Sequence, residues 1–525
     1  MIHFKKKLLL LLIVSVTHFS TYAQLSKNWF NEDPSKEKFA GVSSDLAYEE
    51  LLKQKKSTTV IVAIIDGGTD ITHPDLKDQI WVNSDEIPGN GIDDDSNGYI
   101  DDIHGWSFIG GREGDVSYDS YEAVRVYKMY QPLYEGKSAG GLNDEQKIQY
   151  KQFHEAKKFI DRELAEAKKE LQEYEKLKSQ LDALKTALGS GPFKAEDVAM
   201  YQTQDSEFNK LKTGIASAMT SGVPFDEIYD DVMSGHKSYS DKVNYYLNTT
   251  FDPRAIVGDN YADYSERFYG NNNVAGPDAS HGTHVAGIVG ADRDNGIGMK
   301  GVAADVQLMI LRVVPDGDER DKDVANAIRY ATDNGAKIIN MSFGKDFSPG
   351  KQHVDAAVQY AASKDVLLVH GAGNDNSNID EEANFPHPYY ESTGTREPAW
   401  LEVGAISSSG DIASFSNYGA KKVDILAPGV KIYSTIPDSG YANFNGTSMA
   451  APVVSGIAAM IRSYYPDMSA VMVRKVIMDS AIKMPVKTIR PGTKKKKVKY
   501  STLCATGGIA NAYRALKVAD AYSRN

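Results

Sequence analysis

Five short apolar runs, rich in β-branched residues, constrain the fold of this chain most strongly. Such runs are typical of parallel strands that are buried on both faces. Helical patterns lie between them, for example at 323–334 and 353–363. Because strand and helix alternate, the sequence predicts an α/β fold with a doubly wound, mostly parallel sheet. In such a sheet the functional residues lie at the carboxyl ends of the strands. The five runs are 58–66, 306–314, 336–343, 366–373 and 401–407.

Between residues 111 and 250 the strand signals stop and a long helical pattern replaces them. Asn143 can cap a helix, and Gln146 is placed to complete a capping box. Apolar residues then recur at steps of three and four as far as Leu188, which describes one stripe along a helix. A second apolar pattern at 198–215 predicts a helix that folds back. We expect a helical hairpin inserted into the α/β domain, either as a structural addition or as a surface for a partner.

The first residues predict export. Lys5, Lys6 and Lys7 precede an apolar run at 8–16, which is typical of a secretory signal and is too short to span a bilayer. We expect cleavage after Ala23 and a periplasmic or extracellular protein. The predicted domains are the signal at 1–23, an N-terminal segment at 24–58, the α/β domain at 59–110 and 251–525, and the insertion at 111–250.

Charge and cysteine usage narrow the possible partners. The net charge is −12, so nucleic acid is excluded as an expected partner. A lysine run at 494–497 is a local exception, and we interpret it as a solvated loop. Because Cys504 is the single cysteine, no intramolecular disulfide can stabilise the exported chain. No later segment is apolar enough to predict stable membrane insertion.

Three polar residues stand at strand ends or helix starts. Asp66 ends the first run, His281 opens "HGTHVAG", and Ser448 lies in "NGTSMAAP". Each alone has an ordinary explanation as a turn residue, a packed histidine or a helix cap. Together they supply a nucleophile, the base that serine needs, and a carboxylate that orients that base. Asn374 follows another strand, where its amide and the Ser448 backbone N–H can stabilise an oxyanion.

The segments "VAIIDGG", "HGTHVAG", "GAGN" and "NGTSMAAP" resemble the four signature blocks of the subtilisin-like serine proteases, the subtilases or peptidase S8 family. The resemblance covers about residues 60–102 and 252–525. The chain departs from the family at Gly67, where a serine or threonine is usual, so a hydroxyl beside the aspartate is in doubt. The resemblance implies that Asp66, His281 and Ser448 form the triad, that Asn374 is the oxyanion donor, and that His284 is structural.

The same resemblance implies how a substrate binds. A peptide would add a strand beside Ser342-Phe343-Gly344 and a segment near 315–317, so that main-chain pairing gives affinity and side pockets give selectivity. Asp375 follows the oxyanion residue and would border the pocket for the residue before the cut. Our hypothesis is that Asp375 favours a basic residue there.

The segment "NGIDDDSNGYIDD" at 90–102 concentrates carboxylates around a glycine. Asp93, Asp95 and Asn97 alternate before Gly98, and Asp101 follows, as at the start of an EF-hand loop. The match is partial because the twelfth position lacks the bidentate glutamate. We predict structural calcium, since packed carboxylates repel unless neutralised and subtilases commonly carry calcium loops. The alternative is an acidic turn, and no organic cofactor is expected.

The sequence therefore predicts an exported serine endopeptidase that acts on proteins or peptides through an acyl-enzyme on Ser448. Two alternatives remain open. One is a dedicated processing peptidase with few substrates. The other is an inactive relative that serves as a binding or scaffold module through its helical insertion.

Overall fold

The structure is a computed structural model that describes residues 25–36, 39–189 and 191–524. In this part of the chain nine strands form the main sheet, in the order β12-β15-β9-β8-β7-β6-β1-β5-β2. Every neighbouring pair is parallel except β12 with β15. The doubly wound, mostly parallel sheet predicted from the sequence is confirmed.

The five predicted strands all occur. Four are slightly shorter than their apolar runs, and the strand predicted at 401–407 is shifted by one residue. The strands are β1 (Val60–Asp66), β5 (Val306–Arg312), β6 (Ile338–Met341), β7 (Leu367–Gly371) and β8 (Trp400–Ile406). Four shorter strands extend the sheet and escaped prediction because two to four residues carry too little periodicity. They are β2 (Gly105–Ser107), β9 (Ile425–Pro428), β12 (Ile482–Lys483) and β15 (Gly508–Ile509).

Helices cover both faces of the sheet. The two predicted helices are α9 (Asp321–Asp333) and α10 (Lys351–Ser363), and they share one apolar core with alternate residues of β1 such as Ala63 and Ile65. The intervening strand residues point to the opposite face, where α8 (Ser280–Gly290) and α11 (Thr447–Tyr464) pack against the strands and each other. The remaining α-helices of this part are α2 (Ser44–Ala47), α12 (Ala470–Ser480) and α13 (Ala512–Ser523).

Three small antiparallel ribbons lie outside the main sheet. They are β3 with β4 (Gly110–Gly111 and Gly114–Asp115), β10 with β11 (Ile432–Ile436 and Gly440–Phe444), and β13 with β14 (Lys487–Ile489 and Lys497–Lys499). The β10–β11 ribbon contacts α8, the helix that begins beside His281. It therefore supports one edge of the site described below.

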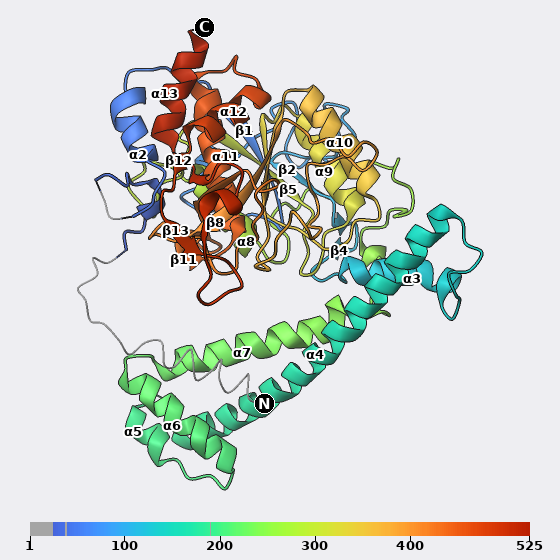
Figure 1. Ribbon diagram of the computed structural model, residues 1–525, viewed down its shortest axis with the longest axis vertical. Helices are drawn as coiled ribbons and strands as arrows, with labels where there is room; N and C mark the ends of the chain where they lie inside the picture. Colours follow the sequence, from blue (N-terminus) through green and yellow to red (C-terminus); the bar gives the residue numbers. More distant parts are fainter. Residues whose placement is uncertain (1–24, 37–38, 190, 525) are drawn as a thin grey trace. The chain divides into compact units, whose positions relative to one another are not determined.

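Residues Ala123–Phe251 form a separate compact unit of helices. Its longest helix, α4 (Asp144–Leu188), begins with the predicted capping box of Asn143 and Gln146. The helix predicted to fold back is instead divided into α5 (Ala195–Met200) and α6 (Ser206–Thr220), and α7 (Phe225–Asp241) packs along α4 (Figure 1). The first helix, α3 (Glu122–Tyr134), leads into the unit. Its core includes Leu177, Leu181, Leu184, Val198, Phe208, Ile215, Phe225 and Val232.

One side chain of the α/β part bridges the two segments of that part that precede and follow the helical unit. Arg320 donates to the carboxylate of Asp119 at 2.6 Å and to that of Asp252 at 3.1 Å. The chain therefore leaves and re-enters the α/β part at neighbouring points, as expected for an inserted unit. No described helix is long and apolar enough to cross a membrane. The predicted signal at 1–23 lies outside the described residues.

Candidate active site

Three adjacent strands carry functional side chains to one edge of the sheet. Asp66 is the last residue of β1, Ser342 directly follows β6, and Asn374 lies three residues after β7. Because β7, β6 and β1 are neighbours and all parallel, their carboxyl ends meet at this edge. Residues from sequence positions hundreds apart thus share one location.

Asp66 and His281 form a direct pair. Nδ1 of His281 lies 2.7 Å from Oδ1 of Asp66, which also accepts a hydrogen bond from the Gly67 backbone N–H at 2.8 Å. Oδ2 of Asp66 is buried and has no hydrogen-bond partner among the described residues. A serine or threonine at position 67 would offer a hydroxyl near Asp66. Gly67 has no hydroxyl, which agrees with the lack of a hydrogen-bond partner for Oδ2 of Asp66 in the described part of the chain.

The environment of His281 favours its charged form. Its side chain is 43% exposed, whereas that of Asp66 is 3% exposed. Desolvation lowers the pKa of His281, but the charge of Asp66 and its hydrogen bond outweigh desolvation and raise the pKa above its ordinary value. The pair therefore has the polarity of a base whose cationic form is stabilised by a buried carboxylate.

Ser448 lies in the first turn of α11, and Ser342 fixes its position. Oγ of Ser448 donates to the Ser342 carbonyl at 3.1 Å, and Oγ of Ser342 donates to the Ser448 carbonyl at 2.9 Å. The Ser448 proton is thus directed to a carbonyl rather than to His281. Catalytic hydrogen bonds often tighten only when substrate binds, so the attack predicted for Ser448 requires this hydroxyl to turn toward the imidazole.

Asn374 is oriented by the start of α11. Its Oδ1 accepts from the Thr447 backbone N–H at 2.9 Å and from Oγ1 of Thr447 at 3.2 Å. Because the amide oxygen is engaged, the Nδ2 group is the end left to donate. The side chain is exposed, as a donor toward a bound substrate must be. The backbone N–H of Ser448 is one residue from this anchor.

A second asparagine, Asn417, holds the turn that carries Asn374, and the sequence reasoning missed it. Its Oδ1 accepts from the backbone N–H groups of Asp375 at 3.0 Å and Ser377 at 2.9 Å, and its Nδ2 donates to the Ala372 carbonyl at 2.9 Å. Asn417 is 2% exposed. The available signal was a polar residue inside the segment "ASFSNYG" at 413–419.

His284 has a structural position. The ring is fully buried, stacks on Phe444 with centroids 4.2 Å apart, and places Nε2 3.0 Å from the Ile432 carbonyl. Burial lowers its pKa to about 3, so the neutral ring ties α8 to the β10–β11 ribbon. This answers which histidine of "HGTHVAG" faces Asp66.

The predicted substrate segment Ser342-Phe343-Gly344 rests on a buried ion pair. Nε2 of His370 lies 2.7 Å from the Phe343 carbonyl, and its Nδ1 lies 2.8 Å from Oε1 of Glu402. Both side chains are at most 2% exposed. Desolvation lowers the pKa of His370, but Glu402 outweighs it and the pKa is raised. Both ring nitrogens face acceptors, so the charged imidazole fixes this carbonyl. Sequence reasoning did not identify the pair.

Asp375, the predicted specificity residue, lies exposed after Asn374. Its Oδ2 is 3.4 Å from Nδ2 of Asn417, a long contact that leaves the carboxylate facing solvent. On the other predicted substrate segment, Asp316 pairs with Tyr118 through hydrogen bonds of 2.8 and 2.9 Å with its neighbours Asp119 and Ser117. That segment is therefore supported from behind by 117–119.

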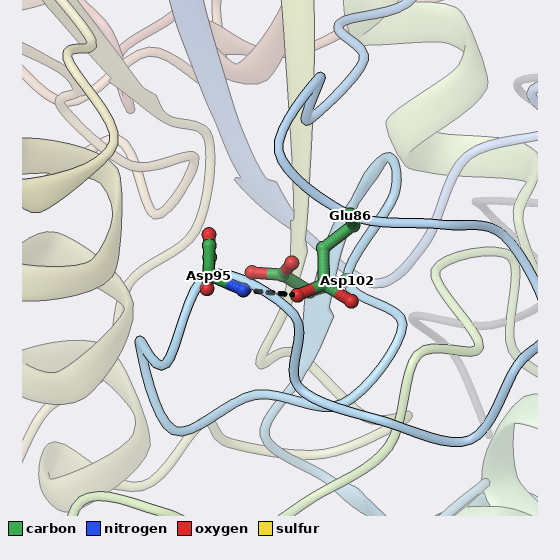
Figure 2. Close-up of side chains that lie close together, drawn as sticks. All are labelled: Glu86, Asp95 and Asp102. Carbon is green, nitrogen blue, oxygen red and sulfur yellow. Dashed lines mark hydrogen bonds between the residues drawn. The ribbon is translucent and has the colours of Figure 1, made fainter.

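The acidic loop forms a carboxylate cluster that differs from the predicted ligand set. Glu86, Asp95 and Asp102 point toward one another, with oxygen atoms within 4.8 Å (Figure 2). Oxygen ligands about 2.4 Å from a calcium ion can be that far apart, so the donor set fits a hard cation. Burial raises the pKa of Asp102.

The other predicted ligands make hydrogen bonds within the loop. Both carboxylate oxygens of Asp101 accept from backbone N–H groups of 89–91. Those of Asp93 accept from the Asn97 and Gly98 N–H groups at 3.0 and 2.8 Å. Asn97 donates from Nδ2 to both Asp95 and Asp102 at 3.0 Å. The EF-hand spacing therefore located the loop but did not reveal Glu86 and Asp102.

Comparisons with known proteins identify the family of the chain. The model of the Subtilase family matches residues 57–507. Subtilisin DY of Bacillus licheniformis is 39% identical over 202 residues, which cover 38% of this chain and 70% of that protein. The thermophilic serine proteinase of Bacillus sp. (strain AK1) is 37% identical over 219 residues, or 42% of this chain and 49% of that protein. The solved structure of the prenylagaramide maturation protease PagA is 30% identical over 46% of this chain and 82% of that one, with a TM-score of 0.38.

Proposed function

The chain belongs to the subtilase family of serine endopeptidases, and on that premise we propose that it cleaves peptide bonds through an acyl-enzyme on Ser448. His281 is the general base and Asp66 orients it. Asn374 and the Ser448 backbone N–H bind the oxyanion. The main support for this proposal is the 2.7 Å hydrogen bond between Nδ1 of His281 and Oδ1 of Asp66, at the same sheet edge as Ser448 and Asn374.

Acylation begins when Oγ of Ser448 transfers its proton to Nε2 of His281 and attacks the substrate carbonyl carbon. The imidazolium that forms is stabilised by Asp66, whose Oδ1 already accepts from Nδ1 at 2.7 Å. The carbonyl oxygen becomes negative and moves toward Nδ2 of Asn374. His281 then gives its proton to the leaving amine, and the peptide bond breaks.

Deacylation repeats the same proton transfers with water. His281 accepts a proton from a water molecule, the hydroxide attacks the acyl carbon, and the proton returns to Oγ of Ser448 as the acid leaves. The substrate main chain would pair with Ser342-Phe343-Gly344 throughout. His370 supports this pairing by holding the Phe343 carbonyl at 2.7 Å.

The decisive test is labelling by a fluorophosphonate probe, together with casein cleavage, on the wild type and on Ser448→Ala. We expect labelling and cleavage in the wild type and neither in the variant. Labelling without casein cleavage would favour the dedicated processing peptidase. A folded wild-type protein that is not labelled would favour the inactive binding module and contradict the proposal.

We also propose export and a structural calcium ion. The Lys5–Lys7 cluster and the apolar run at 8–16 support export through a signal peptide. The cluster of Glu86, Asp95 and Asp102 supports the calcium proposal. A bound calcium ion would neutralise the repulsion between these three carboxylates. Calcium would there supply stability by binding the folded state, because the single cysteine leaves no intramolecular disulfide.

The exposed carboxylate of Asp375 supports the proposal that a basic residue precedes the cut. Removing its charge in Asp375→Asn should lower the ratio of kcat/KM for lysine over leucine at that position. An unchanged ratio would remove Asp375 from the specificity determinants.

A further inference from the structure

The β13–β14 hairpin concentrates positive charge in an otherwise acidic protein. Residues 486–499 contain seven lysines and arginines and no acid, while the whole chain has a net charge of −12. None of these seven side chains forms an ion pair with a described residue. The seven are Lys487, Arg490, Lys494, Lys495, Lys496, Lys497 and Lys499.

The pairing of the hairpin directs this charge outward. Lys487 faces Lys499 and Ile489 faces Lys497 across the two strands, and all four residues are exposed. The alternate pair, Thr488 and Val498, faces inward, where Oγ1 of Thr488 donates to Asp411 at 3.1 Å. Like charges directly opposite each other destabilise a hairpin. The lysines therefore do not serve the stability of the fold.

The turn of this hairpin lies against the active-site loop. A Cβ built on Gly492 would lie 2.5 Å from Oδ1 of Asn376. Asn376 is two residues from Asn374, the proposed oxyanion donor, and two residues span at most about 7 Å. An extended peptide advances about 3.4 Å per residue, so a few residues of a bound substrate can reach the lysines at 494–497.

We propose that the β13–β14 hairpin is a secondary binding site for an acidic segment of the substrate. This inference rests on the proposed function and names its substrate class: peptides or proteins with clustered Asp or Glu a few residues from the cut. Carboxylates of that segment would complement the unpaired ammonium groups of Lys494, Lys495, Lys496 and Lys497. The solvated loop expected from the sequence thus becomes part of substrate recognition.

Binding is measured first, on the full chain carrying Ser448→Ala, so that the readout does not require turnover. Two fluorescent peptides share a neutral core, and one carries a run of glutamates before the core while the other carries it after the core. Matched control peptides carry glutamines in place of the glutamates. We expect one glutamate peptide to bind about tenfold more tightly at low salt, with the difference vanishing near 0.5 M salt, where the Debye length falls to a few ångströms.

Two quartets of substitutions separate local from net charge. The test quartet changes Lys494, Lys495, Lys496 and Lys497 to Gln and should bring the glutamate preference to within about twofold. The control quartet changes Lys158, Lys168, Lys169 and Lys210 to Gln as well. These four lysines are exposed on the helical unit, and the control variant should keep the preference for the glutamate peptide. Equal loss in both quartets, or equal binding of both peptides by the parent, would overturn the proposal.

Two further measurements test the proposal: peptide turnover by the active enzyme and binding to anionic lipid vesicles. With the active enzyme, the kcat/KM ratio of glutamate to glutamine peptides should follow the binding ratio, chiefly through KM. Binding of anionic phospholipid vesicles that is lost in the test quartet, without a glutamate preference, would overturn the proposal in favour of membrane attachment. An absence of fluorophosphonate labelling at Ser448 would instead contradict the proposed function while leaving the binding result intact.

Discussion

Asn374 offers the sharpest test of how the site stabilises charge. Its Oδ1 is held by the Thr447 backbone N–H at 2.9 Å and by Oγ1 of Thr447 at 3.2 Å, so Nδ2 is the end that the proposal makes the oxyanion donor. Asn374→Ala removes one oxyanion donor, which costs about 2.7–4 kcal/mol of transition-state stabilisation, or about 10²–10³ in kcat. Since the substrate carbonyl is neutral in the ground state, KM should change little.

Asn374→Asp separates the two ends of this amide. A carboxylate keeps an acceptor for the Thr447 N–H, so the start of α11 stays anchored, but it replaces the donor with a negative charge. We expect kcat to fall at least as far as in Asn374→Ala, while the free energy of unfolding stays closer to that of the wild type. Losing the anchor in the alanine variant should cost about 1 kcal/mol.

The assay is steady-state hydrolysis of a peptide substrate, with urea unfolding of the same preparations. A loss carried by KM, or a kcat within about threefold of the wild type, would refute donation by Nδ2. An active Asn374→Asp variant and an inactive Asn374→Ala variant would also refute donation by Nδ2, because Asn374 would then act through its Oδ1 on Thr447.

Three further predictions concern protonation, metal and the buried ion pair. Because the general base must be neutral and Asp66 raises the pKa of His281, kcat/KM should fall as pH drops through a midpoint above 6.5, and Asp66→Asn should move that midpoint down; an identical pH profile in the variant would contradict this. Excess EGTA should lower the Tm of the wild type by a few degrees, because calcium at 100 times its Kd stabilises by about 2.7 kcal/mol. The double variant Glu86→Gln with Asp102→Asn should have a Tm that EGTA does not change, and a calcium-insensitive wild type would exclude the site. Glu402→Gln leaves the charged, fully buried His370 without its partner and should lower the free energy of unfolding by about 3–5 kcal/mol; a urea-unfolding loss under 1 kcal/mol would show that the pair is dispensable.

The sequence by itself determined the architecture and named the residues of the candidate site. Apolar runs of β-branched residues can be buried on both faces only in a parallel sheet, so the alternation of strand and helix fixed the fold class. It also placed Asp66 and Asn374 at strand ends, where parallel strands bring side chains to one edge. The capping box of Asn143 and Gln146 is a local interaction, and it too was predictable.

Tertiary structure decided everything that depends on contacts between distant segments. Asn417 and the pair of His370 with Glu402 act through bonds to residues 27–45 positions away, and no local periodicity encodes such partners. Glu86 joined the carboxylate cluster for the same reason, since the chain folds back on the loop whose spacing suggested a metal. The helix expected at 198–215 is divided for a local reason instead: Asp205 caps α6, and its Oδ1 accepts hydrogen bonds from the backbone N–H groups of Glu207 and Phe208 at 2.8 and 3.1 Å.

The lysines at 494–497 show the same division. Their charge is plain in the sequence, and charge runs are ordinarily solvated. The approach of Gly492 to Asn376, two residues from the proposed oxyanion donor, exists only in the folded chain. Sequence sets which groups a protein carries, but the distance between groups far apart along the chain is a property of the packed backbone.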